Sequence, residues 1–204
     1  MKSFNTISEL NTWEQIIDKS RFIGIVVPLT SIDQLDMAMK NIRDNYPNAR
    51  HYVYAYRLYE GLIEKSSDDG EPQGTGGRPV MDILQHGDIW NVLVVVVRYF
   101  GGVLLGTGGL SRAYGGTARQ LINETNLKKL SLYQVYHLNV PYEWYEMIKY
   151  QFGLRNWLIS KEDFSEVVQL LVHVPEVESQ AFTQWINDFS KKQVSYTEQS
   201  TVWR

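Results

Sequence analysis

The spacing of apolar side chains at the start of the chain predicts a strand followed by a helix. Residues 23–26 form a strand-like run, and Pro28 ends it because proline cannot donate a hydrogen bond to a neighbouring strand. Residues 31–46 then carry apolar side chains at helical spacing behind Ser31, a favourable N-cap residue.

The pattern from residue 51 to residue 123 predicts two more strands and two more helices. Residues 51–59 alternate as a strand does, and residues 92–97 are apolar throughout, as in a central strand covered on both faces. Residues 79–84 are predicted to form a short helix, and residues 107–123 a longer one with a single apolar stripe. Residues 65–77 are polar and are predicted to be a loop.

The last third of the chain repeats the alternation of strands and helices in a recognisable order. Strands are predicted at residues 135–140, 157–159, 167–174 and 194–202, with helices at 142–152 and around Phe182, Trp185 and Phe189. The order βαββαβ is that of the ferredoxin-like fold. The pattern as a whole predicts an α+β protein.

Glycine and charge are distributed unevenly enough to suggest a domain boundary. Twelve of the 15 glycines lie between Gly70 and Gly116. Basic and acidic residues are balanced before Leu130, at 14 each, whereas 6 basic and 9 acidic residues follow it. We place the boundary in residues 128–133, where two lysines are favourable at the end of a preceding helix, and predict domains at 1–131 and 132–204.

The amino-acid composition excludes several classes of protein function. The chain has no cysteine, which excludes a disulfide framework, a thiolate metal site and a cysteine nucleophile, and a reducing cytoplasm fits best. No signal peptide is visible, and the apolar run 92–97 is far below the roughly 20 residues that span a bilayer. We expect a soluble cytoplasmic protein with no membrane partner. The formal net charge of −3 argues against a strongly basic domain, but a local basic groove is compatible with it.

The strongest chemical signal is a glycine-rich turn between a buried strand and a helix. Arg98 ends the strand, and the helix is predicted to begin at Thr107, followed by Gly108 and Gly109. Free amides at a helix start bind anions, and Arg98 with Arg112 would add fork-shaped positive charge. The alternative is structural: the glycines allow close helix packing, and Thr107 is an N-cap.

Other polar residues gather beside the same turns. Asp68, Asp69 and Glu71 could hold Mg²⁺ jointly with a phosphate, although the same residues also favour a tight turn whose carboxylates pair with Arg78, Arg98 or Arg112. No other cofactor is expected. His51 heads a strand near this cluster and is either a general base or a hydrogen-bonding residue.

Standard nucleotide motifs fail. Residues 101–108 have the glycine spacing of a P-loop start but lack its Lys. Segments 74–79 and 106–111 each lack the third glycine of a dinucleotide-binding fingerprint.

At these motifs the sequence resembles the YigZ/IMPACT family, and in particular its bacterial two-domain members. The segments that carry the resemblance are Lys19-Ser20-Arg21-Phe22-Ile23, Ala49 with His51, Tyr54-Ala55-Tyr56, Asp68-Asp69-Gly70-Glu71-Pro72, Gly77-Arg78-Pro79, Arg98-Tyr99-Phe100-Gly101-Gly102 and Leu105-Gly106-Thr107-Gly108-Gly109-Leu110. The resemblance implies an N-terminal domain of the ribosomal protein S5 domain 2-like fold. It also implies a ferredoxin-like C-terminal domain, similar to one in elongation factor G.

The resemblance implies a role in translation, since the eukaryotic relatives regulate translation by competing for a scaffold that activates a starvation-responsive kinase. Two functions follow. The first is a non-catalytic regulator that binds RNA, the ribosome or a translation protein through a groove containing Arg98 and Arg112; no preference for DNA is evident. The second is a Mg²⁺-assisted enzyme acting on a phosphorylated or carboxylated small molecule, with His51 as base. A purely structural salt-bridge network is the third interpretation, and we favour the first.

Overall fold

The computed structural model describes residues 3–204, which divide into two compact units, Phe4–Lys129 and Leu130–Arg204, with Ser3 grouped with the second. A short strand β1 (Ser3–Thr6) precedes the first unit's sheet and forms a parallel bridge between Asn5 and Ile89. No helix among residues 3–204 is both long enough and apolar enough to cross a membrane.

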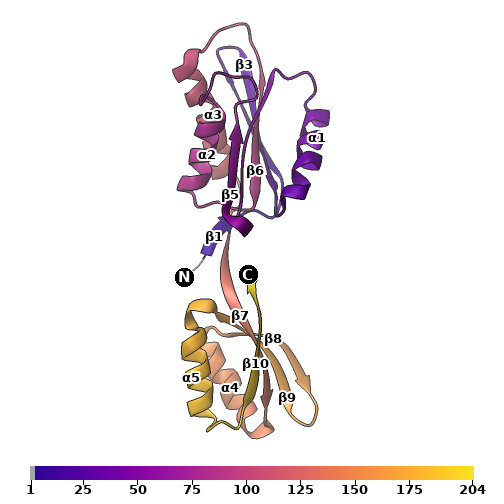
Figure 1. Cartoon of the computed structure of the whole chain (residues 1–204), viewed down its shortest axis with the longest axis vertical. Helices are drawn as coiled ribbons and strands as arrows, with labels where there is room; N and C mark the ends of the chain where they lie inside the picture. The colour runs from indigo at the N-terminus through magenta and orange to yellow at the C-terminus, as the bar shows by residue number, and fades with distance from the viewer. Residues whose placement is uncertain (1–2) are drawn as a thin grey trace. The chain divides into compact units, whose positions relative to one another are not determined.

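The first unit is an antiparallel sheet with helices on both faces (Figure 1). Its strands follow the order β2-β3-β6-β4-β5. The strands are β2 (Asn11–Ile17), β3 (Ser20–Pro28), β4 (His51–Leu58), β5 (Ile63–Ser67) and β6 (Val92–Tyr99), and the helices are α1 (Leu35–Asn45), α2 (Gly77–His86) and α3 (Gly106–Asn123).

Two apolar layers explain this arrangement. Every residue from Val92 to Val97 in β6 is buried, because its even-numbered side chains pack under α2 and α3 and its odd-numbered ones under α1. A strand covered on both faces needs apolar side chains in both directions. The central strand in turn fixes the end of the sheet at which β6 delivers Arg98 and at which β4 begins with His51.

The second unit has its own core on one face of a second sheet. Its elements are β7 (Lys128–Val140), α4 (Tyr142–Arg155), β8 (Leu158–Phe164), β9 (Val168–Pro175), α5 (Ser179–Phe189) and β10 (Ser195–Trp203). Strand pairing runs β10-β7-β9-β8, with every pair antiparallel. Phe152 and Phe182 from the two helices pack with Trp157. The predicted ferredoxin-like fold is confirmed by this order and by the alternation of elements.

Two local predictions were wrong, and one strand was not predicted. The first three residues of the polar segment 65–77 belong to strand β5, which pairs with β4 at the sheet edge. Strand β2, which no pattern predicted, forms the other edge. The helix near the boundary ends at Asn123, and the two lysines at 128 and 129 instead begin strand β7. Neither edge strand has a fully buried residue, so neither carries the run of apolar side chains that marks β3 and β6.

Candidate functional site

The loop between β5 and α2 is organised around the Asp68 carboxylate. Its two oxygens accept hydrogen bonds from the backbone N–H groups of Gly74, Gly76 and Gly77 at 2.8–2.9 Å. Burial works to raise the pKa of Asp68, but these three donors outweigh it and hold the pKa below its usual range. Asp68 therefore shapes the loop and the start of α2.

A buried ion pair lies where this loop meets β6 and α3. Oε1 of Glu71 accepts hydrogen bonds from Nη1 of Arg98 and from the hydroxyl of Tyr114, each at 2.7 Å. The Glu71 and Arg98 side chains are only 4% and 6% exposed. Burial, reinforced by the bond to Glu71, raises the pKa of Tyr114 far above its usual value. The tyrosine therefore remains a hydrogen-bond donor.

His51 and Asp69 hold the same loop against β4. The His51 Nδ1 lies 2.8 Å from the carbonyl oxygen of Asp69, and the Asp69 carboxylate accepts a bond from the N–H of Tyr52. His51 Nε2 lies 3.8 Å from Oε1 of Glu71, beyond hydrogen-bond distance. Asp69 also has Arg43 as a neighbour at 3.8 Å.

The turn between β6 and α3 passes close to another part of the backbone. A Cβ at Gly101 would lie 2.0 Å from the backbone carbon and oxygen of Lys19, so only glycine fits. The turn is further fixed by the Ser20 hydroxyl, which accepts a bond from the N–H of Gly101. Helix α3 then starts at Gly106, one residue before the predicted start, with Leu105 in the N-cap position and no side-chain cap. Thr107 is therefore inside the first turn and is not the N-cap.

These elements enclose a cleft of about 450 Å³, which we call the Glu71 cleft. It contains residues from the start of β4, the loop after β5, the end of β6 and the first turn of α3. The lining residues used below are Arg50, His51, Glu71, Arg98, Phe100 and Thr107.

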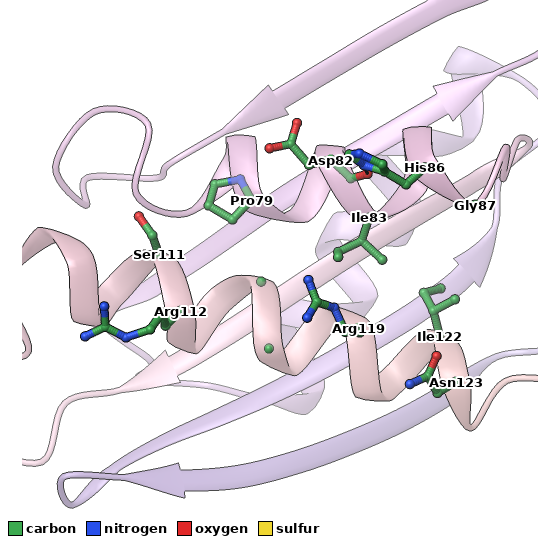
Figure 2. Close-up of a pocket in the computed structure, with 12 residues that line it drawn as sticks. Pro79, Asp82, Ile83, His86, Gly87, Ser111, Arg112, Arg119, Ile122 and Asn123 are labelled. Atoms are coloured by element: carbon green, nitrogen blue, oxygen red, sulfur yellow. Dashed lines mark hydrogen bonds between the residues drawn. The ribbon is translucent and has the colours of Figure 1, made fainter.

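A second and larger hollow, of about 800 Å³, lies between α2 and α3 (Figure 2). We call it the α2–α3 groove. Its lining includes Asp82 and His86 from α2 and Arg112, Gly115 and Arg119 from α3. The helices approach closely at Gly115, where a Cβ would lie 3.3 Å from Cβ of Pro79.

The two arginines of α3 are the uncompensated charges of this groove. Figure 2 shows Arg119 extending from α3 toward α2, whereas Arg112 lies along α3 toward its first turn. Arg112 Nη1 is 3.5 Å from the position that a Gly108 Cβ would take. Within residues 3–204, neither guanidinium has an ion pair or a side-chain hydrogen bond. Asp82, the acidic residue of the groove, is already paired with Arg78 at 2.7 Å.

The structure therefore divides the predicted site residues between two places. His51, Glu71, Arg98 and Thr107 meet at the Glu71 cleft, whereas Arg112 lines the α2–α3 groove. Gly108 and Gly109 lie in the first turn of α3, and Arg78 is an exposed residue of α2. The predicted groove placed Arg98 beside Arg112, but Arg98 is buried against Glu71 instead.

The sequence interpretation missed Arg119 and Tyr114. Arg119 follows Arg112 by seven residues, a spacing that returns to the same helix face after two turns and was a usable signal.

The three carboxylates proposed for Mg²⁺ do not converge. Asp68 binds backbone amides, Asp69 binds Tyr52, and Glu71 binds Arg98 and Tyr114. Across the described residues, no three His, Asp or Glu side chains are grouped as metal ligands.

Comparison with known proteins agrees with this architecture. Residues 18–122 match the Impact N-terminal domain, and residues 138–191 match a domain of unknown function (DUF1949). A solved structure described as that of a hypothetical protein matches with a TM-score of 0.62 and 30% identity, covering 96% of this chain and 97% of that one. The protein is thus a two-domain α+β protein with an S5 domain 2-like unit and a ferredoxin-like unit.

Sequence relatives identify the family. "IMPACT family member YvyE" of Bacillus subtilis is 32% identical over 93% of this chain and 88% of its own length. "IMPACT family member YigZ" of Escherichia coli is 33% identical over 86% and 87%. Vertebrate proteins named "Protein IMPACT" match about half of the chain. The chain belongs to the IMPACT family, as its motifs predicted.

Proposed function

We propose that this chain is a translation-associated regulatory protein that binds RNA through the α2–α3 groove. The observation that carries the proposal is the pair of unpaired guanidiniums, Arg112 and Arg119, on one face of α3. Seven residues of helix separate them by about 10.5 Å along the axis. Free guanidiniums on one surface supply the electrostatic contacts on which nucleic-acid affinity mostly depends.

Two further features bear on the partner and on the surface that binds it. The family relation supports the connection to translation, because the eukaryotic relatives that the sequence resembles act there. The second unit, with 6 basic and 9 acidic residues from Leu130 onward, is a poor electrostatic match for phosphate.

The test is equilibrium binding to single-stranded RNA, together with co-sedimentation with ribosomes at low salt. The Arg112→Ala/Arg119→Ala variant is compared with wild type and with Lys40→Ala/Lys65→Ala. The control removes the same charge from two other exposed positions, on α1 and β5. We expect about a tenfold loss for the arginine variant and little change for the control. Absence of wild-type binding, or equal losses in both variants, would reject the proposal.

A further inference from the structure

The Glu71 cleft is separate from the groove assigned to RNA, and it has the size of a small-molecule site. Its volume of about 450 Å³ lies within the range of ligand pockets, roughly 300–1,000 Å³. It combines buried charged side chains with apolar ones, as such pockets do. Its floor and its rim carry different hydrogen-bonding groups.

The floor of the cleft presents hydrogen-bond acceptors. Glu71 uses Oε1 for Arg98 and Tyr114, while Oε2 accepts no hydrogen bond from the described residues. The carbonyl oxygen of Asp69 can only accept, so His51 donates to it from Nδ1, and in an imidazole with that tautomer Nε2 is a hydrogen-bond acceptor. Oε2 of Glu71 and Nε2 of His51 would both accept hydrogen bonds from a ligand that has two neighbouring hydroxyl groups.

The rim presents donors for an anion. The first turn of α3 lines the cleft with Gly106 and Thr107, and no side chain caps its free amides. Arg50 adds an exposed guanidinium at the same rim. Arg98 also lines the cleft, at its floor: its side chain is 6% exposed, its Nη1 is bonded to Glu71, and its buried Nε has no hydrogen-bond partner within residues 3–204. Together these groups favour a phosphate at the rim.

An aromatic ring completes the cleft. The guanidinium carbon of Arg98 lies 5.4 Å from the centre of the Phe100 ring, and Phe100 is 44% exposed. A partly exposed ring backed by a cation is a platform on which a nucleobase stacks, and such stacking tolerates any base.

We propose that the Glu71 cleft binds a nucleoside monophosphate. The base stacks on Phe100, the ribose hydroxyls donate to Oε2 of Glu71 and Nε2 of His51, and the phosphate accepts from the first turn of α3 and from Arg50. Such a group comes either from a free mononucleotide or from the terminal nucleotide of an RNA. Both sources share the chemistry described, and the experiment separates them.

The experiment is calorimetric titration of the full chain with adenosine 5′-monophosphate. Two other ligands are titrated for comparison: adenosine, which lacks the phosphate, and 2′,3′-dideoxyadenosine 5′-monophosphate, which lacks both ribose hydroxyls. Because the protein is the same in all three titrations, its folding cannot account for a difference. We expect each to bind at least about tenfold more weakly, since hydrogen bonds to charged groups are lost. A pentaribonucleotide with free terminal hydroxyls is then used as a competitor. Competition assigns the site to an RNA end, and its absence assigns it to the free nucleotide.

Protein variants give a second readout. Phe100→Ala and Arg50→Ala change exposed side chains and are each expected to weaken the monophosphate about fivefold or more. Lys40→Ala/Lys65→Ala, at exposed positions outside the cleft, serves as the control and is expected to leave monophosphate binding unchanged. Failure of the monophosphate to bind at millimolar concentration, or binding indifferent to the ribose hydroxyls and to Phe100, would overturn this proposal. Neither result bears on RNA binding by the α2–α3 groove.

Discussion

At the scale of single residues, Asp68 is the side chain on which the geometry of the β5–α2 loop most depends. One carboxylate satisfies three backbone donors, of which those of Gly76 and Gly77 belong to buried residues. Asp68→Ala removes all three bonds at once, and hydrogen bonds to a charged group are worth about 1.5–3 kcal/mol each before compensation by water. We expect urea denaturation to show a loss of at least about 2 kcal/mol.

The contribution of Asp68 has a definite pH dependence. Because folding lowers its pKa, the stabilisation is fully present above the unfolded value, about 3.9, and is lost as pH falls through the lower folded value. The difference in stability between wild type and Asp68→Asn should therefore be constant from pH 5 to 7 and shrink below about pH 4. A difference that grew on acidification would contradict this assignment.

The Glu71–Arg98 pair gives a second expectation at this scale. Glu71→Gln leaves the buried Arg98 charge without its partner, and such a change costs about 3–5 kcal/mol. Tyr114→Phe removes a single bond to the same carboxylate and should cost about 1–2 kcal/mol. Thermal or urea unfolding measures both losses of stability. Equal losses in the two variants would show that the unpaired charge of Arg98 is not the main cost of Glu71→Gln.

At the scale of elements, two glycines around α3 have opposite roles. Gly101 has no space for a Cβ, since backbone atoms of Lys19 would lie 2.0 Å from it. At Gly116 the nearest atom, Nε2 of Gln15, would lie at 3.7 Å, an ordinary contact.

Substitution by alanine should separate these roles. Gly116→Ala should raise the free energy of unfolding by about 0.5–1 kcal/mol, because alanine favours the helix interior. Gly101→Ala should lower it by about 2 kcal/mol or more, because the backbone must shift. Chemical denaturation of the matched pair checks both signs, and a stabilising Gly101→Ala would show that the turn can relax freely.

The elements also show what the sequence could predict. Buried strand β6 and helix α3 were found within two residues of their bounds, because one is apolar on both faces and the other has a clear stripe. Strand β5 was missed because four of its five residues are exposed, and strand β2 because polar side chains dominate its first five positions and none of its residues is fully buried. The sequence pattern predicted the strands and helices that bury apolar side chains, and it did not predict the strands at the edges of the sheet.

The site was harder to predict than the fold for a related reason. The motifs located the right turns, but whether a given arginine is paired depends on contacts across the sequence. Arg98 meets Glu71 from 27 positions away, while Arg112 has no partner among the described residues. Local spacing carries no information about such pairing.

At the scale of the whole molecule, each unit buries its own apolar residues, and we expect each to unfold by its own equilibrium. Phe182 is fully buried in the second core, and Phe182→Ala should destabilise that unit by about 3–5 kcal/mol. Hydrogen exchange should quicken in β7, β9 and α5 while protection in β3 and β6 persists. Leu84→Ala in the first core is the reciprocal control. Uniform loss of protection in both units would contradict independence.

The whole molecule carries a net charge of −3, so the RNA binding that we propose depends on a local cluster of positive charge. The most direct test is the dependence of RNA affinity on salt concentration, measured for wild type and for Arg112→Ala/Arg119→Ala. Each phosphate contact on a single strand contributes about 0.7 to the slope of log affinity against log salt. The account predicts a slope smaller by about 1.4 in the double variant. An unchanged slope would show that the two arginines do not contact the RNA backbone.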